Sequence, residues 1–132
     1  MPVFTIETTY HLPVFRHRTI EAPTVEEACR LAVEDDDWEG QVEDYETSGE
    51  THVTGVWEGA DAAHRGPVLP WPALFDELIQ RKADHYATLL AILRRPARTM
   101  GLSPVEFEQW LPEAFAAVAE ADAIMAGRAP PP

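Results

Sequence analysis

The spacing of apolar residues changes once along the chain, at a segment rich in Gly and Pro, and this change constrains the fold most. Near the N-terminus, Phe4, Ile6, Thr8 and Tyr10 alternate with their neighbours, the period of a strand with one buried face. Beyond residue 72, apolar residues recur at steps of three and four, the period of a helix. The chain of 132 residues fits about one domain. We therefore predict an α+β fold with the sheet first and the helices after it.

The first half predicts a ββαββ module over residues 1–58, an antiparallel sheet with one helix packed on it. Extended patterns cover residues 3–10, 14–21, 41–47 and 51–58. Thr24, followed three residues later by Glu27, is typical of a helix N-terminus, and that helix is expected to end near Glu34. Ser48 and Gly49 form a turn signal between the last two strands.

The second half predicts a linker over residues 59–72, with Trp71 as an apolar anchor, and then a helical region over 73–127. Two or three helices are expected there, packing on the first module or on a partner subunit. Ser103 and Glu106 predict the start of one helix, and Pro112 is expected to kink or restart it. Residues 128–132 are expected to form a frayed tail.

Apolar residues fall at alternating steps of four and three along the first of these helices, which is the spacing of a helix–helix seam. Lys82 lies in the same stripe and must extend to water. The stripe is expected either to pack inside the chain or to join two copies of it. The candidate dimer seam comprises Phe75, Ile79, Tyr86, Leu89 and Leu93.

The net charge is −13, and residues 1–59 carry most of it, with 14 acids and three arginines. Such a field repels phosphate backbones and anionic membranes and favours cations or a basic protein partner. The candidate partner-binding acidic face comprises Asp35, Asp36, Asp37, Glu39, Glu43, Asp44 and Glu46.

The segment 35–46 resembles the calcium-binding loop of an EF-hand, with Gly40 at the turn position. The sequence after Glu43 reads as a strand where an EF-hand requires a helix, and no second loop is found. Two alternatives stay open, a solvated turn between helix and strand, and a mimic of nucleic acid that blocks a basic protein. The calcium ligands would be Asp35, Asp37, Glu39, the Gln41 carbonyl, Glu43 and Glu46.

Residues 94–111 resemble a helix-turn-helix unit with Gly101 at its turn. The second helix of that unit carries Glu106, Glu108 and Glu113 but no Lys or Arg. Because phosphate contact requires cations, we expect no direct nucleic-acid binding.

No catalytic motif is found, and the five histidines show no ligand spacing, although His17, His52 and Glu7 could meet across strands. We assign no catalytic residue and no cofactor, apart from the calcium hypothesis. No apolar stretch is long enough to span a membrane. We predict a small, acidic, cytoplasmic accessory or regulatory protein that acts by protein–protein interaction, with a homodimer as one form of it.

Overall fold

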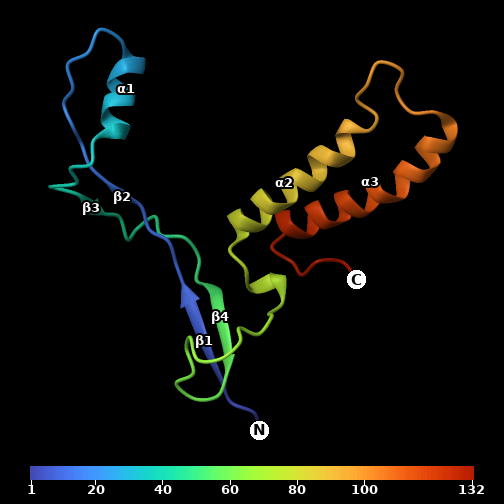
Figure 1. Cartoon of the computed structure of the whole chain (residues 1–132), viewed down its shortest axis with the longest axis horizontal. Coiled ribbons are helices and arrows are strands. Elements are labelled where there is room, and N and C mark those ends of the chain that lie inside the picture. The colour runs from blue at the N-terminus through green and yellow to red at the C-terminus, as the bar shows by residue number, and fades with distance from the viewer. The chain divides into compact units, whose positions relative to one another are not determined.

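The computed structural model describes residues 1–132 and confirms the α+β fold (Figure 1). Its strands pair as two separate two-stranded antiparallel sheets, β1 with β4 and β2 with β3, where the sequence predicted one. The elements in chain order are β1 (Phe4–Thr9), β2 (Val14–Phe15), α1 (Val25–Glu34), β3 (Val42–Glu43), β4 (His52–Glu58), a 3-10 turn (Ala73–Phe75), α2 (Leu78–Arg94) and α3 (Pro104–Met125).

The chain divides into two compact units, residues 1–9 with 51–132, and residues 10–50. This boundary falls inside the predicted 1–58 module, because β1 and β4 belong with the helices. The second unit holds α1 and the short β2–β3 pair. The strands predicted over 14–21 and 41–47 shorten to two residues each, and beyond them Arg16 and Arg18 donate to carbonyls of the loop after α1.

A β-bulge decides which side chains share a face of the β1–β4 sheet. The register changes between Glu7, opposite Gly55, and Thr8, opposite Val53, so Thr54 has no residue across from it. Because one extra residue reverses the alternation, Val53 and Val56 lie on one face with Ile6. Regular strand alternation would place Val53 on one face with Trp57, and the bulge separates them.

The predicted linker packs on this sheet through several hydrogen bonds. The Thr5 hydroxyl donates to the Gly59 carbonyl at 2.8 Å and accepts from the Ala62 amide at 3.0 Å. The Leu69 amide donates to the Val56 carbonyl at 2.8 Å, on the edge of β4 that faces away from β1. The segment is therefore part of the first unit's structure.

Helices α2 and α3 form a hairpin whose ends follow local sequence signals. Ser103 accepts from the Glu106 amide at 3.2 Å while the Glu106 carboxylate accepts from the Ser103 amide, which confirms the predicted capping box. Pro112 lies inside α3 without ending it, so no new helix starts there. Neither helix is both long enough and apolar enough for a membrane crossing.

Candidate functional site

Two arginines hold the loop that follows α1. Arg16 donates to the carbonyls of Ala32 and Asp35 at 2.9 and 2.6 Å, and also to that of Asp37. Its guanidinium carbon lies 4.0 Å from the centre of a Trp38 ring. Arg18 donates to the Asp37 and Glu39 carbonyls at 2.7 and 2.8 Å. Backbone oxygens in the first half of the calcium-loop candidate are thus already bonded to cations of the chain itself.

The acidic side chains of this loop bond mostly to the loop's own backbone. Asp35 accepts from the Asp37 amide at 2.9 Å, and Asp37 accepts from the Glu39 amide at 3.0 Å. No three of the carboxylates between residues 35 and 46 converge at metal-ligand distances. The calcium hypothesis stays a prediction, without a ligand cluster to support it.

The second half of the acidic stretch is ordered by Asp44. Its carboxylate accepts from the Thr47 hydroxyl at 2.6 Å and from the amides of Glu46 and Thr47, and these bonds hold the pKa of Asp44 below its ordinary value. The Tyr45 hydroxyl donates to Glu43 at 2.6 Å, which raises the pKa of Tyr45. Five of the seven predicted acidic-face residues are exposed: Asp36, Asp37, Glu39, Glu43 and Glu46.

One face of the β1–β4 sheet carries a polar network. The Thr54 hydroxyl donates to Glu7 at 2.7 Å and lies 2.8 Å from the Thr9 hydroxyl. The other Glu7 oxygen lies 3.5 Å from Nε2 of His64, which is three-quarters exposed. The sequence grouped Glu7 with His17 and His52, but the structure pairs it with His64. These groups are open to water, and no nucleophile with a separate base is formed.

Trp57 is the most buried aromatic residue and lies on the same sheet. It is 2% exposed, and its ring centre lies 4.8 Å from that of His64. A Cβ added to Gly55 would lie 2.3 Å from the Trp57 ring, so glycine is required beneath it. Its Nε1 is the only buried side-chain N or O atom without a hydrogen-bond partner.

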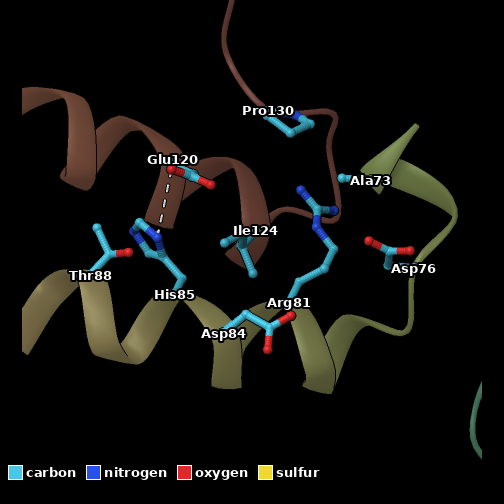
Figure 2. A pocket seen from close by; sticks show the side chains of 9 residues that line it. All are labelled: Ala73, Asp76, Arg81, Asp84, His85, Thr88, Glu120, Ile124 and Pro130. Atoms are coloured by element: carbon cyan, nitrogen blue, oxygen red, sulfur yellow. Dashed lines mark ion pairs between the residues drawn. The ribbon is translucent and has the colours of Figure 1, made fainter. Parts of the chain in front are cut away.

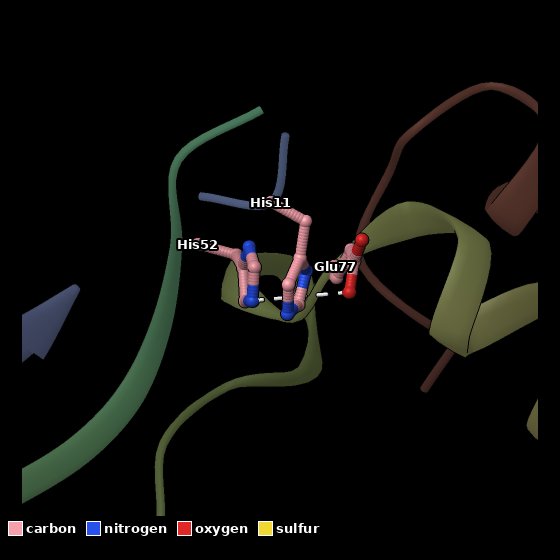
Figure 3. A group of neighbouring side chains, drawn as sticks. All are labelled: His11, His52 and Glu77. Atoms are coloured by element: carbon pink, nitrogen blue, oxygen red, sulfur yellow. Dashed lines mark ion pairs between the residues drawn. The ribbon is translucent and has the colours of Figure 1, made fainter. Parts of the chain in front are cut away.

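A histidine–carboxylate pair joins the sheet to the helical hairpin within the first unit. His52, 7% exposed at the start of β4, lies 3.8 Å from a carboxylate oxygen of Glu77, the N-cap residue of α2 (Figure 3). The sequence gave no sign of this pair, because the two residues are 25 positions apart and belong to different elements.

The helical hairpin buries an arginine and a histidine beside a polar pocket of about 170 Å³ (Figure 2). Arg81 donates to the Arg128 carbonyl at 2.7 Å. Nε2 of His85 lies 2.8 Å from the Ala117 carbonyl, and since a carbonyl only accepts, this nitrogen is the donor. Nδ1 then faces Glu120 at 3.7 Å. Asp76, Asp84 and Glu120 line this pocket together with Arg81 and His85, so acidic and basic side chains are mixed in it.

The buried pair also shows which face of α2 packs on α3. Arg81, His85 and Ile92 point toward α3, and the Trp110 Nε1 donates to the Ile92 carbonyl at 2.8 Å. Of the predicted seam, Ile79, Tyr86 and Leu93 are 60–68% exposed. Leu89 is half-buried, and Phe75, in the 3-10 turn, is 50% exposed. At 100° per residue, the exposed stripe lies about 100° around the helix from His85.

Apolar residues of α3 continue this exposed surface. A groove of about 220 Å³ is lined by Lys82 and Leu89 of α2 and by Ala121 and Met125 of α3, so these residues share one side of the hairpin. Val118 lies one helical turn before Ala121 and Asp122 and is 53% exposed. We name this surface the hairpin face, comprising Ile79, Lys82, Tyr86, Leu89, Leu93, Val118, Ala121 and Met125.

A second apolar surface lies on the β1–β4 sheet. It is a groove of about 430 Å³ between the sheet and the segment that leads to α2. Trp71 Nε1 donates to Asp76 at 2.7 Å, and this hydrogen bond fixes the indole in the wall of the groove. The groove is lined mainly by apolar residues, which confirms that this tryptophan meets an apolar surface. We name it the sheet groove, lined by Phe4, Ile6, Val53, Val56, Leu69, Pro70, Trp71, Pro72 and Phe75.

Two of the three arginines within the helix-turn-helix resemblance are engaged by acids. Arg95 forms an ion pair with Glu113, and Arg98 donates to Glu106 and to the Gly101 carbonyl. These bonds stabilise the corner between α2 and α3.

Comparison with known proteins adds no assignment. No family model, no curated protein and no solved structure matches the chain.

Proposed function

We propose that this protein is an acidic accessory or regulatory protein that acts by protein–protein contact and that two copies associate through the hairpin face. The observation that carries the proposal is the unpartnered apolar stripe of α2, with Ile79, Tyr86 and Leu93 each at least 60% exposed. A helix with such an apolar stripe normally packs the stripe against another helix, as in helical bundles.

The total exposed surface supports an interaction function. The chain exposes 10239 Å². Two compact bodies of the sizes of the two units would expose roughly 8,300 Å² even without touching each other. The surplus of roughly 2,000 Å² exceeds the share of about 800 Å² that each partner buries in a standard interface. The molecule thus has enough extra surface for a dimer contact and for a further partner.

A second copy suits the hairpin face because the face is self-complementary in chemistry. It has large apolar side chains on both helices, and Lys82 is its only charged member. Two hairpins related by a two-fold axis would form a four-helix bundle with these residues as its core. Most soluble homo-oligomers use a two-fold contact of this type. The exposed acids of the 35–46 stretch favour a basic partner.

Sedimentation velocity on the full chain tests the dimer. We expect twice the chain mass of 14.7 kDa for the wild type and a return to one chain mass for Tyr86→Glu. Tyr86 is 67% exposed, so the substitution leaves the monomer's own packing intact. Ala91→Glu is the matched control, because Ala91 is exposed on the same helix about 140° from Tyr86.

The outcomes separate the alternatives. A wild-type chain that stays monomeric at all concentrations refutes the dimer, and so does a Tyr86→Glu variant that still dimerises. Equal dissociation by Tyr86→Glu and Ala91→Glu would show that charge on the helix, and not the hairpin face, controls association.

A further inference from the structure

We infer that the β1 edge and the sheet groove bind an extended peptide of a partner protein, with apolar side chains at alternate positions and Lys or Arg beside them. This site lies away from the hairpin face, and the inference does not depend on the dimer. Addition of a strand to an open sheet edge is a common way to recognise extended peptides.

The two edges of the β1–β4 sheet differ in what already occupies them. The Gly59 amide donates to the Val3 carbonyl at 2.7 Å, so the pair of Val3 with Gly59 exchanges hydrogen bonds across the sheet. In an antiparallel pair, residues that bond to the partner strand alternate with residues whose N–H and C=O groups point outward. The backbone groups of Phe4 and Ile6 therefore point away from β4. On β4 the outward Val56 carbonyl accepts from Leu69. No such bond covers Phe4 or Ile6.

The apolar side chains beside this open edge all lie on one face. Phe4 and Ile6 are 50% and 49% exposed, and they line the sheet groove with Val53 and Val56. The opposite face is closed to a peptide's apolar residues by the bonds that Thr5 makes with residues 59 and 62. A strand added to β1 would therefore place every second side chain against the groove.

The groove is shaped before a peptide arrives. The hydrogen bond from Trp71 to Asp76 fixes the indole, and the bond from Leu69 to Val56 fixes the segment beneath it. Fixed walls lower the entropic cost of binding. β1 has six residues, a length of about 20 Å. The bound segment would thus be five or six residues long, with two or three apolar side chains facing the groove.

Charge sets the flanking residues of the peptide. Glu7 follows Ile6 in β1, so its side chain lies on the face opposite the groove, where it is 41% exposed. The chain as a whole carries −13. A Lys or Arg next to the residue that meets Ile6 would lie on the same face as Glu7, and the net negative charge of the chain favours such a basic flank over an acidic one.

The test uses the wild-type full chain and the synthetic peptide KVTVTVK with blocked ends. We expect saturable binding by NMR titration, and slower hydrogen exchange of the Phe4 and Ile6 amides in the complex. The amides of Thr5 and Glu7, already bonded to β4, should change little. A peptide of the same sequence, N-methylated at alternate residues on the edge that faces β1, should bind at least tenfold more weakly.

Protein variants separate this site from the hairpin face. Ile6→Lys should weaken KVTVTVK binding at least tenfold, whereas Tyr86→Glu should bind it as the wild type does. Because the methylated peptide leaves the protein unaltered, its result holds even if Ile6→Lys disturbs folding. Absence of saturation at millimolar peptide overturns the inference, and so does equal binding of both peptides. A change of solution mass caused by Ile6→Lys would assign the edge to a second copy and also overturn it.

Discussion

Gly55→Ala is the substitution whose effect can be worked most directly from the structure. The added Cβ would lie 2.3 Å from one Trp57 ring atom and 2.7 and 3.1 Å from two more. Since carbon atoms rest at about 3.5–4.0 Å, the ring must recede by more than about 1 Å. Trp57 is 2% exposed, so a shift of its ring must displace the residues that cover it.

The expected cost combines two opposing terms. Overpacking of a filled site costs about 1–3 kcal/mol, while replacing glycine returns about 0.4–1 kcal/mol by restricting the unfolded chain. We therefore expect a net loss of about 1–2 kcal/mol in the free energy of unfolding. In a unit of this size that corresponds to a melting temperature lower by about 4–16 °C.

Urea and thermal unfolding, followed by circular dichroism, measure this change. Gly49→Ala is the matched control, because its Cβ would make only an ordinary contact of 3.6 Å and its backbone is not in the left-handed region. In a Trp57→Leu background, which lacks the clashing ring, Gly55→Ala should lose its cost. A Gly55→Ala variant as stable as the wild type, or one whose cost persists without the indole, would refute the steric explanation.

Two further substitutions test local features. Ser103→Ala removes the α3 cap and should cost about 1 kcal/mol in a urea titration. The Ser103 amide, Arg98 and the Ser103 hydroxyl lower the pKa of Glu106 from the ordinary 4.5, so the carboxylate's contribution is complete above that pH and is lost as the pH falls through the lower folded value. Because Ser103→Ala keeps the amide donor, most of this pH dependence of stability should persist in the variant. Arg16→Ala should destabilise the second unit by about 2 kcal/mol and change Trp38 fluorescence, because three carbonyls lose a charged donor. Arg30→Ala, which breaks exposed ion pairs with Glu27 and Glu34, should cost less than Arg16→Ala, and equal losses would contradict the assigned role of Arg16.

Features set by neighbouring residues could be predicted from the sequence. The start of α3 depends on Ser103 and Glu106, three positions apart, and the strand period of β1 depends on adjacent side chains. The α+β class follows from such local patterns. The heptad spacing also identified a real apolar stripe on α2.

Features set by distant residues could not be predicted. Apolar periodicity does not predict that Arg81 and His85 are buried, yet these two polar residues form the buried face of α2. Their burial is possible because carbonyls of the C-terminal segment and of α3 accept their hydrogen bonds. The bulge at Thr54 exchanges the faces of β4 through a single extra residue. Arg16 and Arg18 donate to carbonyls about 20 positions away in the sequence, and no periodic pattern in the sequence predicts such contacts.

The composition of the buried core explains why the exposed apolar faces bear on function. The buried apolar residues are Trp57, Ala62, Ala117, Ala123 and Ile124, and three of these five are alanines. Alanine buries little surface, whereas Phe4, Ile79, Tyr86, Leu93 and Met125 stay half or more exposed. At roughly 25 cal/mol per Å², covering these exposed side chains would add hydrophobic free energy that the isolated chain does not gain. A partner that covers them stabilises the folded state by mass action. In the association proposed above, folding and binding would therefore draw on the same residues.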